Sequence, residues 1–227
     1  LSTMTKKILI ALVVIAAGLY WFTHRATSVN STDAPGFKPL RDDALAQKYR
    51  PYLLASEFGK PQALYYRASR SGEKLYITYH YVWDREVNNA EGWKPWLSRN
   101  LYTGGLALQR TMFGKGDIEM VSLVLDGEGK VESVVYETAL GHSPSDFSVK
   151  HETIRTARPA TPLVFKVISW NHLFLLQEKP PDPSAWLDLD VEYFTQPLWE
   201  EYEMFKEKET VLKRNRAHEI YERAPAH

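Results

Sequence analysis

The feature that most constrains the fold is the stretch Gly116–Thr138, which reads GDIEMVSLVLDGEGKVESVVYET. Asp126–Gly129 predicts a tight turn between two strands, because glycine accepts the positive φ that hairpin loops require. The strand before the turn is apolar on both faces, with Ile118, Met120 and Val124 on one and Val121, Leu123 and Leu125 on the other. Such a strand is usually covered on both sides, which predicts the centre of a buried sheet. At its start, Asp117 and Glu119 project from one face.

Two further segments have the pattern of strands. Ala63–Ser69 and Leu75–Asp84 flank the turn Arg70–Glu73, and the second of them alternates between an apolar and a more polar face, as half-buried strands do. Pro162–Ile168 predicts another strand, and the polar residues Ser169–His172 follow it. The main body is therefore expected to be a β-domain.

The N-terminal region is dominated by the uninterrupted apolar run Ile8–Phe22, which Lys6 and Lys7 precede. A membrane-spanning helix needs about 20 residues, and flanking threonines and snorkelling lysines extend this run. We interpret it as an uncleaved anchor in the inner (plasma) membrane, with the lysines in the cytoplasm and the C-terminal domain periplasmic or otherwise extracytoplasmic. A cleaved signal peptide, with Ala16–Gly18 as the cleavage region, and a soluble core helix are the alternatives.

These patterns divide the chain into four parts, namely a membrane anchor at 1–25, a linker with a short helix at 26–62, a β-domain at 63–183 and a C-terminal helical arm at 184–227. In the arm, apolar residues recur at helical spacing from Pro197 to Arg223. A short inserted helix is expected at 96–102, since Pro95 suits a first turn and Gly104 and Gly105 end it.

Composition excludes several classes of function. The chain has no cysteine, so disulfides, thiolate metal sites and cysteine nucleophiles are excluded. Residues 31–227 carry 25 basic and 28 acidic side chains, which argues against a nucleic-acid partner because phosphate binding requires clustered cations. The Gly-x-Ser-x-Gly, HExxH and phosphate-loop motifs are absent from the sequence.

Six titratable residues lie on different predicted strands and loops, where they could converge: His80, Asp84, Asp117, Glu119, His142 and His172. Imidazole with carboxylate suits zinc or another divalent cation. We select Asp117, Glu119, His80 and His172 as the candidate metal ligands. The alternative is that His80 is hydrogen-bonded on the sheet, that the two acids end a strand in solvent, and that His142 is a loop residue. We favour this alternative, in which the protein has no cofactor.

Aromatic residues concentrate at Trp93, Trp96 and Tyr102, around the predicted inserted helix. They indicate either a helix packed over the sheet or an aromatic lid or docking surface. The second interpretation makes these three residues the candidate partner-binding surface.

Three segments resemble a known family. The stretch FGKGDIEMVSLVLDGEGKVESVVYE resembles the GDWE-type strand of the vacuolar protein sorting-associated protein 62 family and, more distantly, the heptapeptide of the necrosis-inducing cytolysins. LYITYHYVWDRE and RPATPLVFKVISWNH are similar to further strands of the former family, so the resemblance covers residues 63–177. It implies an antiparallel β-sandwich and, in the cytolysins, a divalent-metal site. Only Asp117 and Glu119 match that heptapeptide, since Ile118 replaces its tryptophan, and Gly114 and Gly116 replace its histidines.

Two functions from different classes follow. The first is a non-catalytic binding or accessory subunit of a membrane protein complex, anchored through Ile8–Phe22 and contacting other membrane or envelope proteins. The second is a divalent-metal-dependent enzyme or ligand-binding domain. We favour the first and expect no enzymatic activity.

Overall fold

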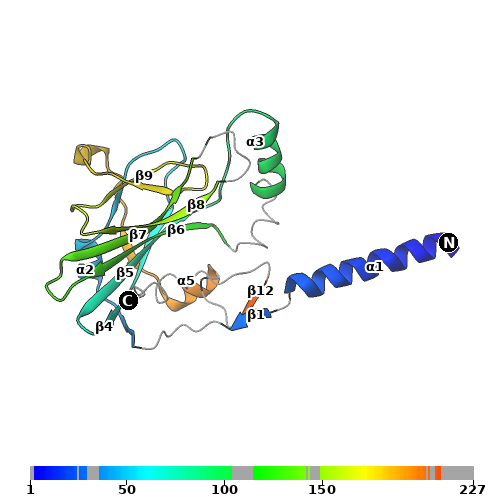
Figure 1. The fold of residues 1–227 in the computed structure, drawn as a ribbon, viewed down its shortest axis with the longest axis horizontal. Coiled ribbons are helices and arrows are strands. Elements are labelled where there is room, and N and C mark those ends of the chain that lie inside the picture. The colour runs from blue at the N-terminus through cyan, green and yellow to red at the C-terminus, as the bar shows by residue number, and fades with distance from the viewer. Residues whose placement is uncertain are drawn as a thin grey trace.

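A computed structural model of the chain describes residues 3–24, 26–29, 36–103, 115–141, 143, 149–202, 204 and 208–210. The body consists of β-sheets packed face to face, and helix α1 (Thr3–His24) projects away from it (Figure 1). The predicted mainly antiparallel β-sandwich with an N-terminal apolar helix is thereby confirmed.

The larger sheet has seven strands in the order β11-β4-β5-β6-β7-β8, with β2 also paired to β4. Its strands are β2 (Lys38–Leu40), β4 (Ala63–Ser71), β5 (Lys74–Trp83), β6 (Asp117–Leu125), β7 (Val131–Ala139), β8 (His151–Ala157) and β11 (Val191–Tyr193). Neighbours run antiparallel except β11, which is parallel to β4. The hairpin turns at Gly72 and Gly129 use glycine at positive φ, as the sequence predicts.

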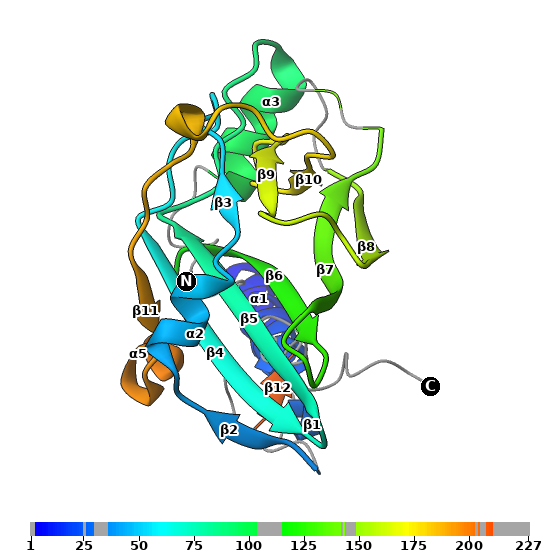
Figure 2. The ribbon, with the colours of Figure 1, turned by 90° about the vertical axis from the view of Figure 1, so that its left-hand side faces the viewer.

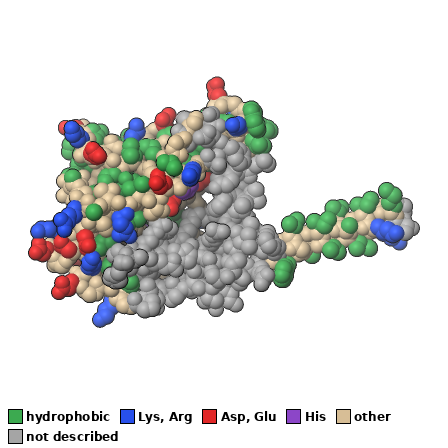
Figure 3. All heavy atoms as spheres, in the orientation of Figure 1, with side chains coloured by type: hydrophobic (Ala, Val, Ile, Leu, Met, Phe, Trp, Pro, Cys, Tyr) green, Lys and Arg blue, Asp and Glu red, His purple; other side chains and the backbone are tan. Residues whose placement is uncertain are grey.

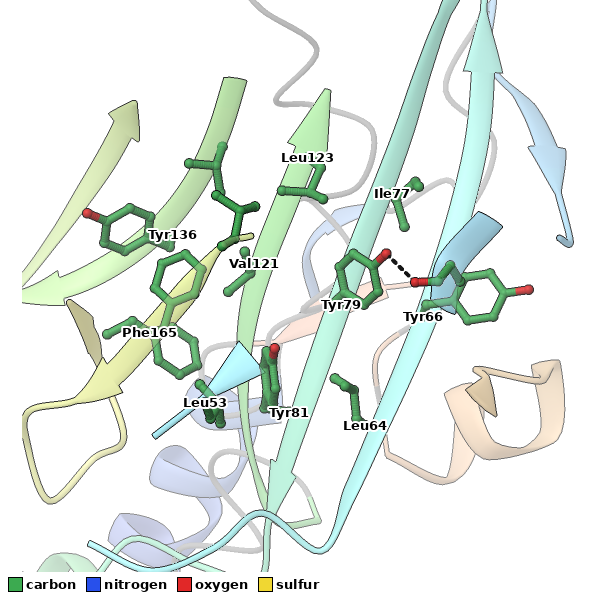
Figure 4. Close-up of a cluster of buried hydrophobic side chains, with 14 of the residues drawn as sticks. Leu53, Leu64, Tyr66, Ile77, Tyr79, Tyr81, Val121, Leu123, Tyr136 and Phe165 are labelled. Atoms are coloured by element: carbon green, nitrogen blue, oxygen red, sulfur yellow. Dashed lines mark hydrogen bonds between the residues drawn. The ribbon is translucent and has the colours of Figure 1, made fainter. Parts of the chain in front are cut away.

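The smaller sheet has the order β10-β9-β3, from β3 (Tyr52–Leu53), β9 (Val164–Val167) and β10 (Phe174–Leu176). It lies over one face of the larger sheet (Figure 2). Aromatic and branched side chains from both sheets meet between them, and Figure 4 shows Phe165 and Leu53 facing Tyr81 and Val121. Tyr79 and Tyr81 are buried there, but each hydroxyl donates to a backbone carbonyl, of Ala46 and Pro51 respectively. The hydroxyl groups of these two core tyrosines therefore have hydrogen-bond partners.

Strand β6 is central, as predicted. Val121, Leu123 and Leu125 are 0%, 1% and 0% exposed and face the smaller sheet. Residues of the opposite parity, such as Ile118, face a second apolar cluster built around Phe194, Trp199 and Met204. Both faces of β6 are covered, which is why the strand is apolar throughout.

The body is longer at both ends than the predicted 63–183. Strands β2 and β3 and helix α2 (Asp43–Lys48) come from the segment expected to be a linker with a short helix, and β11 comes from the expected helical arm. The C-terminal helix is present as α5 (Gln196–Glu201), which ends much earlier than expected. Lys208–Thr210 is not helical, because these residues form β12 and pair with β1 (Ala26–Val29). Residues 211–223 of the expected helix lie outside the described residues.

Two segments between strands also differ in detail from expectation. The stretch 141–159 is polar and has no clear strand pattern, but its second half forms β8, which pairs with β7. The inserted helix begins earlier than expected, as α3 (Trp93–Leu97), and continues as the π-helix η1 (Ser98–Thr103). A 3₁₀ turn, η2 (Pro183–Ala185), precedes β11.

Candidate functional site

The predicted metal ligands are divided between the two faces of the larger sheet. Asp117 and Glu119 pair with Trp83 and Tyr81 across β5 and β6, so all four side chains lie on the face toward the smaller sheet. His80 pairs with Met120 and lies on the opposite face. The two carboxylates are only 7% and 9% exposed, so the alternative that they end a strand in solvent is wrong.

His172 joins the carboxylate face through the turn between β9 and β10. The backbone N–H of His172 donates to the Ser169 carbonyl at 3.0 Å, and Ile168 N–H donates to the Leu173 carbonyl at 2.9 Å. His172 completes this tight loop in the left-handed region, with φ +60°. The turn thus places the imidazole against the start of β6, in the core.

The His172 imidazole is enclosed on three sides. Its Nδ1 lies 2.6 Å from Asp117 Oδ2, its Nε2 lies 3.1 Å from the Phe58 carbonyl oxygen, and its side chain is 3% exposed. The Trp83 indole stacks on it with 4.3 Å between ring centroids and 7° between planes. We call Asp117, His172, Trp83 and the Phe58 carbonyl the acid–histidine corner.

Hydrogen-bond accounting fixes the proton on Nε2. The Phe58 carbonyl oxygen can only accept, so Nε2 carries hydrogen. The other nitrogen, Nδ1, is hydrogen-bonded to Asp117 Oδ2. Each ring nitrogen of His172 is therefore engaged in a hydrogen bond, and neither is free for a metal or a substrate.

A second polar network adjoins the corner through the same turn. Ser169 Oγ accepts from Leu173 N–H at 3.1 Å and donates to Asn171 Oδ1 at 2.7 Å. The Asn171 amide nitrogen donates to His151 Nε2 at 2.9 Å, and His151 Nδ1 lies 2.8 Å from Glu137 Oε2. His151 thus bridges Asn171 and Glu137 through its two ring nitrogens. The network ties β7 and β8 to the smaller sheet.

His80 has a different environment, among aromatic rings. Phe194 and Trp199 contact it edge-on, with centroids 5.2 Å and 5.5 Å away. Neither ring nitrogen has a hydrogen-bond partner at ordinary geometry among the described residues, and the one backbone interaction is with Tyr65 on the neighbouring strand β4, which acts weakly to raise the pKa of His80. Burial, with the positive charge of Arg67 adding to it, lowers the pKa of His80 to about 3. His80 is therefore neutral at physiological pH.

The described residues contain no group of three or more His, Asp or Glu side chains arranged to hold a metal ion. Asp117, Glu119 and His172 do converge on one face, but the nitrogen donors of His172 are already occupied. Asp84 is exposed beyond the end of β5, and His142 lies outside the described residues.

The predicted partner-binding residues behave differently from the other aromatic residues of the body. Trp93 and Trp96 on α3 are 70% and 58% exposed, whereas Trp83, Trp170 and Trp199 are 3% or less. The interpretation of this segment as a helix packed over the sheet thus fails for the two indoles. Tyr102 belongs to η1, and its side chain lies outside the described residues.

Sequence reasoning missed several members of the two networks. Trp83 was visible as the last apolar residue of its strand, and Ser169–His172 as a polar turn after a strand. The Phe58 carbonyl carries no sequence signal, because any residue has one. Glu137 and His151 were detectable only by recognising β8 as a strand beside β7, for which the β-branched residues Thr153, Ile154 and Thr156 were the available signal.

Comparisons with known proteins give fold likeness only. A solved structure described as "Toxin fold for microbial attack and plant defense" aligns with a TM-score of 0.45 and 13% identity, over 79% of this chain and 90% of its own. Two others, "NLPPya in complex with glucosamine" and "NLPPya in complex with mannosamine", align at TM-scores of 0.45 and 0.41 with 12% and 13% identity. They cover 75% and 79% of this chain and 85% and 90% of theirs.

No family model and no curated protein matches the chain. The resemblance to the vacuolar protein sorting-associated family has no support from a family model or a curated protein. At these TM-scores the likeness adds nothing to an argument about activity.

Proposed function

We propose that the protein is a membrane-tethered β-sandwich that acts as a non-catalytic accessory subunit of a membrane protein complex. The single observation that carries the proposal is the closed acid–histidine corner. A histidine that acts as a general base or as a metal ligand needs a nitrogen lone pair within reach of its target, and both nitrogens of His172 are already bonded inside the core. The residues that sequence marks as chemical are thereby used for structure.

Tethering is supported by α1. Its segment Met4–Trp21 has a mean hydropathy of 1.6 and none of it is buried against the body. An apolar helix that is not buried against protein is stable in lipid and unfavourable in water. With Lys6 and Lys7 in the cytoplasm, the sandwich lies on the extracytoplasmic side of the inner (plasma) membrane.

The test of the accessory role is purification of the tagged full chain from its native membrane in mild detergent. We expect a second membrane protein to co-purify in a constant ratio. The matched control is α1 fused to an unrelated soluble protein, which carries the same detergent micelle without the sandwich. Elution of the full chain alone, under conditions that keep other complexes intact, would contradict the proposal.

The second candidate is a divalent-metal or ligand-binding domain, and the convergence of Asp117 and Glu119 on one buried face favours it. Two like charges so placed attract a cation. A metal bound at a hundred times its dissociation constant stabilises the folded state by about 2.7 kcal/mol.

Thermal unfolding of the full chain with zinc, magnesium, calcium or chelator separates the two candidates. We expect the melting temperature to be unchanged by any of these additions. The matched variant is Asp117→Asn, which keeps the size of the side chain and removes its charge. A chelator-sensitive transition that Asp117→Ala and Asp117→Asn both abolish would establish the second candidate instead.

A further inference from the structure

Helix α3 presents its apolar residues to solvent and its small residues to the body, the reverse of an ordinary surface helix. Trp93 and Trp96 are three positions apart and therefore share a face. They are 70% and 58% exposed, whereas Pro95 and Ser98 on the other side are buried. A helix that only covers a sheet would turn the indoles inward. The exposed pair therefore marks an interaction surface.

The contacts beneath α3 hold this orientation. Arg99 Nη1 donates to the carbonyl oxygens of Asn88 and Ala90 at 2.6 Å and 2.7 Å. Asn88 is 1% exposed, and its side-chain oxygen accepts from Ala90 N–H at 3.1 Å. These bonds fasten the beginning of η1 to the segment that precedes α3. The outward direction of the two indoles is therefore built into the fold.

The two ends of the body differ in character. Helix α3 lies at the end from which α1 departs, and the turns of the β4–β5 and β6–β7 hairpins lie at the far end (Figure 1). Charged side chains gather at that far end, and hydrophobic side chains are exposed on α3, among some charged ones, and along α1 (Figure 3). The far end includes the exposed ion pair Lys130–Glu128 and the pair Lys74–Glu132. The two exposed indoles of α3 thus lie at the end of the body from which α1 departs, beside the exposed Glu91 and Lys94.

We propose that Trp93 and Trp96 insert into the head-group layer of the same bilayer that α1 crosses. This rests on the proposed function only in requiring that α1 is an uncleaved anchor. Indole suits that layer, since its ring is apolar and its N–H needs a polar partner. Exposed Lys94, between the two tryptophans, suits anionic head groups. Interfacial side chains of this kind bury to a depth of about 5–10 Å.

Lipid is favoured over a protein as the occupant because the tether already brings α3 to the membrane. Once α1 is inserted, the second contact is intramolecular, and the effective concentration of bilayer at α3 is high. One anchor leaves the body free to tilt, whereas two contacts fix it. The hairpin turns then point away from the membrane, and the acid–histidine corner lies toward it.

The absence of cysteine from the chain allows single probe sites. The full chain is reconstituted in nanodiscs of mixed phosphatidylcholine and phosphatidylglycerol, with a polarity-sensitive fluorophore on Trp93→Cys or Trp96→Cys. Two controls carry the same label: Glu128→Cys, at a side chain 75% exposed on the far end, and Val14→Cys, within the apolar span. Nitroxide lipids, labelled at shallow or deep positions, report the depth of each fluorophore.

We expect the labels at 93 and 96 to emit at shorter wavelength than the label at 128 and to be quenched most by the shallow nitroxide. The label at 14 should be quenched most by the deep one. If the label at 14 reports water, the anchor itself is wrong. If the label at 14 is embedded in the bilayer while the labels at 93 and 96 show the emission and quenching of the label at 128, α1 is an anchor but the insertion of Trp93 and Trp96 is overturned. Shielding of 93 and 96 only after a co-purifying protein is added also overturns it, in favour of a protein partner.

A label-free measurement guards against misfolded variants. Brominated lipids quench tryptophan, so the parent chain should lose more fluorescence in them than Trp93→Ser/Trp96→Ser does, Trp21 in α1 being common to both. Near-ultraviolet circular dichroism verifies that the double variant keeps its tertiary packing. Equal quenching of parent and folded double variant contradicts the inference.

Discussion

His172 and His80 are both buried histidines on opposite faces of one sheet, and their environments are opposites. His172 is 3% exposed, has an acceptor at each ring nitrogen and stacks flat on Trp83. His80 is 0% exposed, has no described hydrogen-bond partner at ordinary geometry and meets two aromatic rings edge-on. His172 is a polar link between the two sheets, whereas His80 packs in the core as an aromatic ring. Burial alone therefore does not define the role of a histidine.

The comparison predicts that substitution of His172 causes the largest loss of stability. Replacing His172 by Ala leaves the Asp117 carboxyl buried without its partner, and a buried polar group left unsatisfied costs roughly 1–3 kcal/mol, or more if it is charged. We expect a loss of that size in the free energy of unfolding, measured by urea denaturation of the full chain in detergent. His172→Asn is the matched control for the backbone, because asparagine tolerates positive φ.

A double-mutant cycle identifies the cause of that loss. His172→Ala combined with Asp117→Ala removes the stranded carboxyl, so part of the stability should return relative to the sum of the single changes. Simple additivity of the two losses would mean that Asp117 and His172 act independently, and the contrast with His80 would disappear.

Because of His80, we expect the free energy of unfolding to depend on pH. The pKa is about 3 in the folded protein and about 6.5 in the unfolded chain, so in between only the unfolded state takes up the proton. Stability should therefore fall as pH decreases from about 6.5 toward about 3, by roughly 1.4 kcal/mol per pH unit from this group. His80→Leu removes that slope. The free energy of unfolding of parent and variant is measured by urea denaturation at several pH values. Equal pH slopes for the two proteins would contradict the prediction.

The smallest effect is expected for His80→Leu at neutral pH. The change removes a buried polar ring with no hydrogen bond at ordinary geometry, a gain of about 1–3 kcal/mol, but it also removes the edge-on contacts with Phe194 and Trp199, worth about 0.5–1.5 kcal/mol each. The two terms oppose, so the free energy of unfolding should change by no more than about 1 kcal/mol. A loss of several kcal/mol would reveal a hydrogen bond to His80 and erase its difference from His172.

Sequence reasoning predicted much of the fold because strand periodicity is local. The alternation in Leu75–Trp83 and Asp117–Leu125 assigns each side chain to a face, and both assignments hold in the structure. The same alternation already separates His80 from Trp83. Which face of β5 continues which face of β6 depends on the register between the two strands, so the alternation within each strand does not by itself separate His80 from Asp117. The helix expected at Pro197–Arg223 failed at 208–210, because pairing with β1 outweighs a helical pattern with a thin apolar stripe.

By itself, the sequence determined that β6 is covered on both faces, that Asp117 and Glu119 share one of them, and that an apolar helix precedes the body. Only the tertiary structure decided that His172 meets Asp117, because the two are 55 positions apart and their contact depends on how one sheet lies on the other. It alone also turned Trp93 and Trp96 outward, since the hydrogen bonds that orient α3 run to backbone carbonyls. Periodicity fixes the face from which a side chain leaves its own strand, whereas the packing of distant elements fixes what it meets.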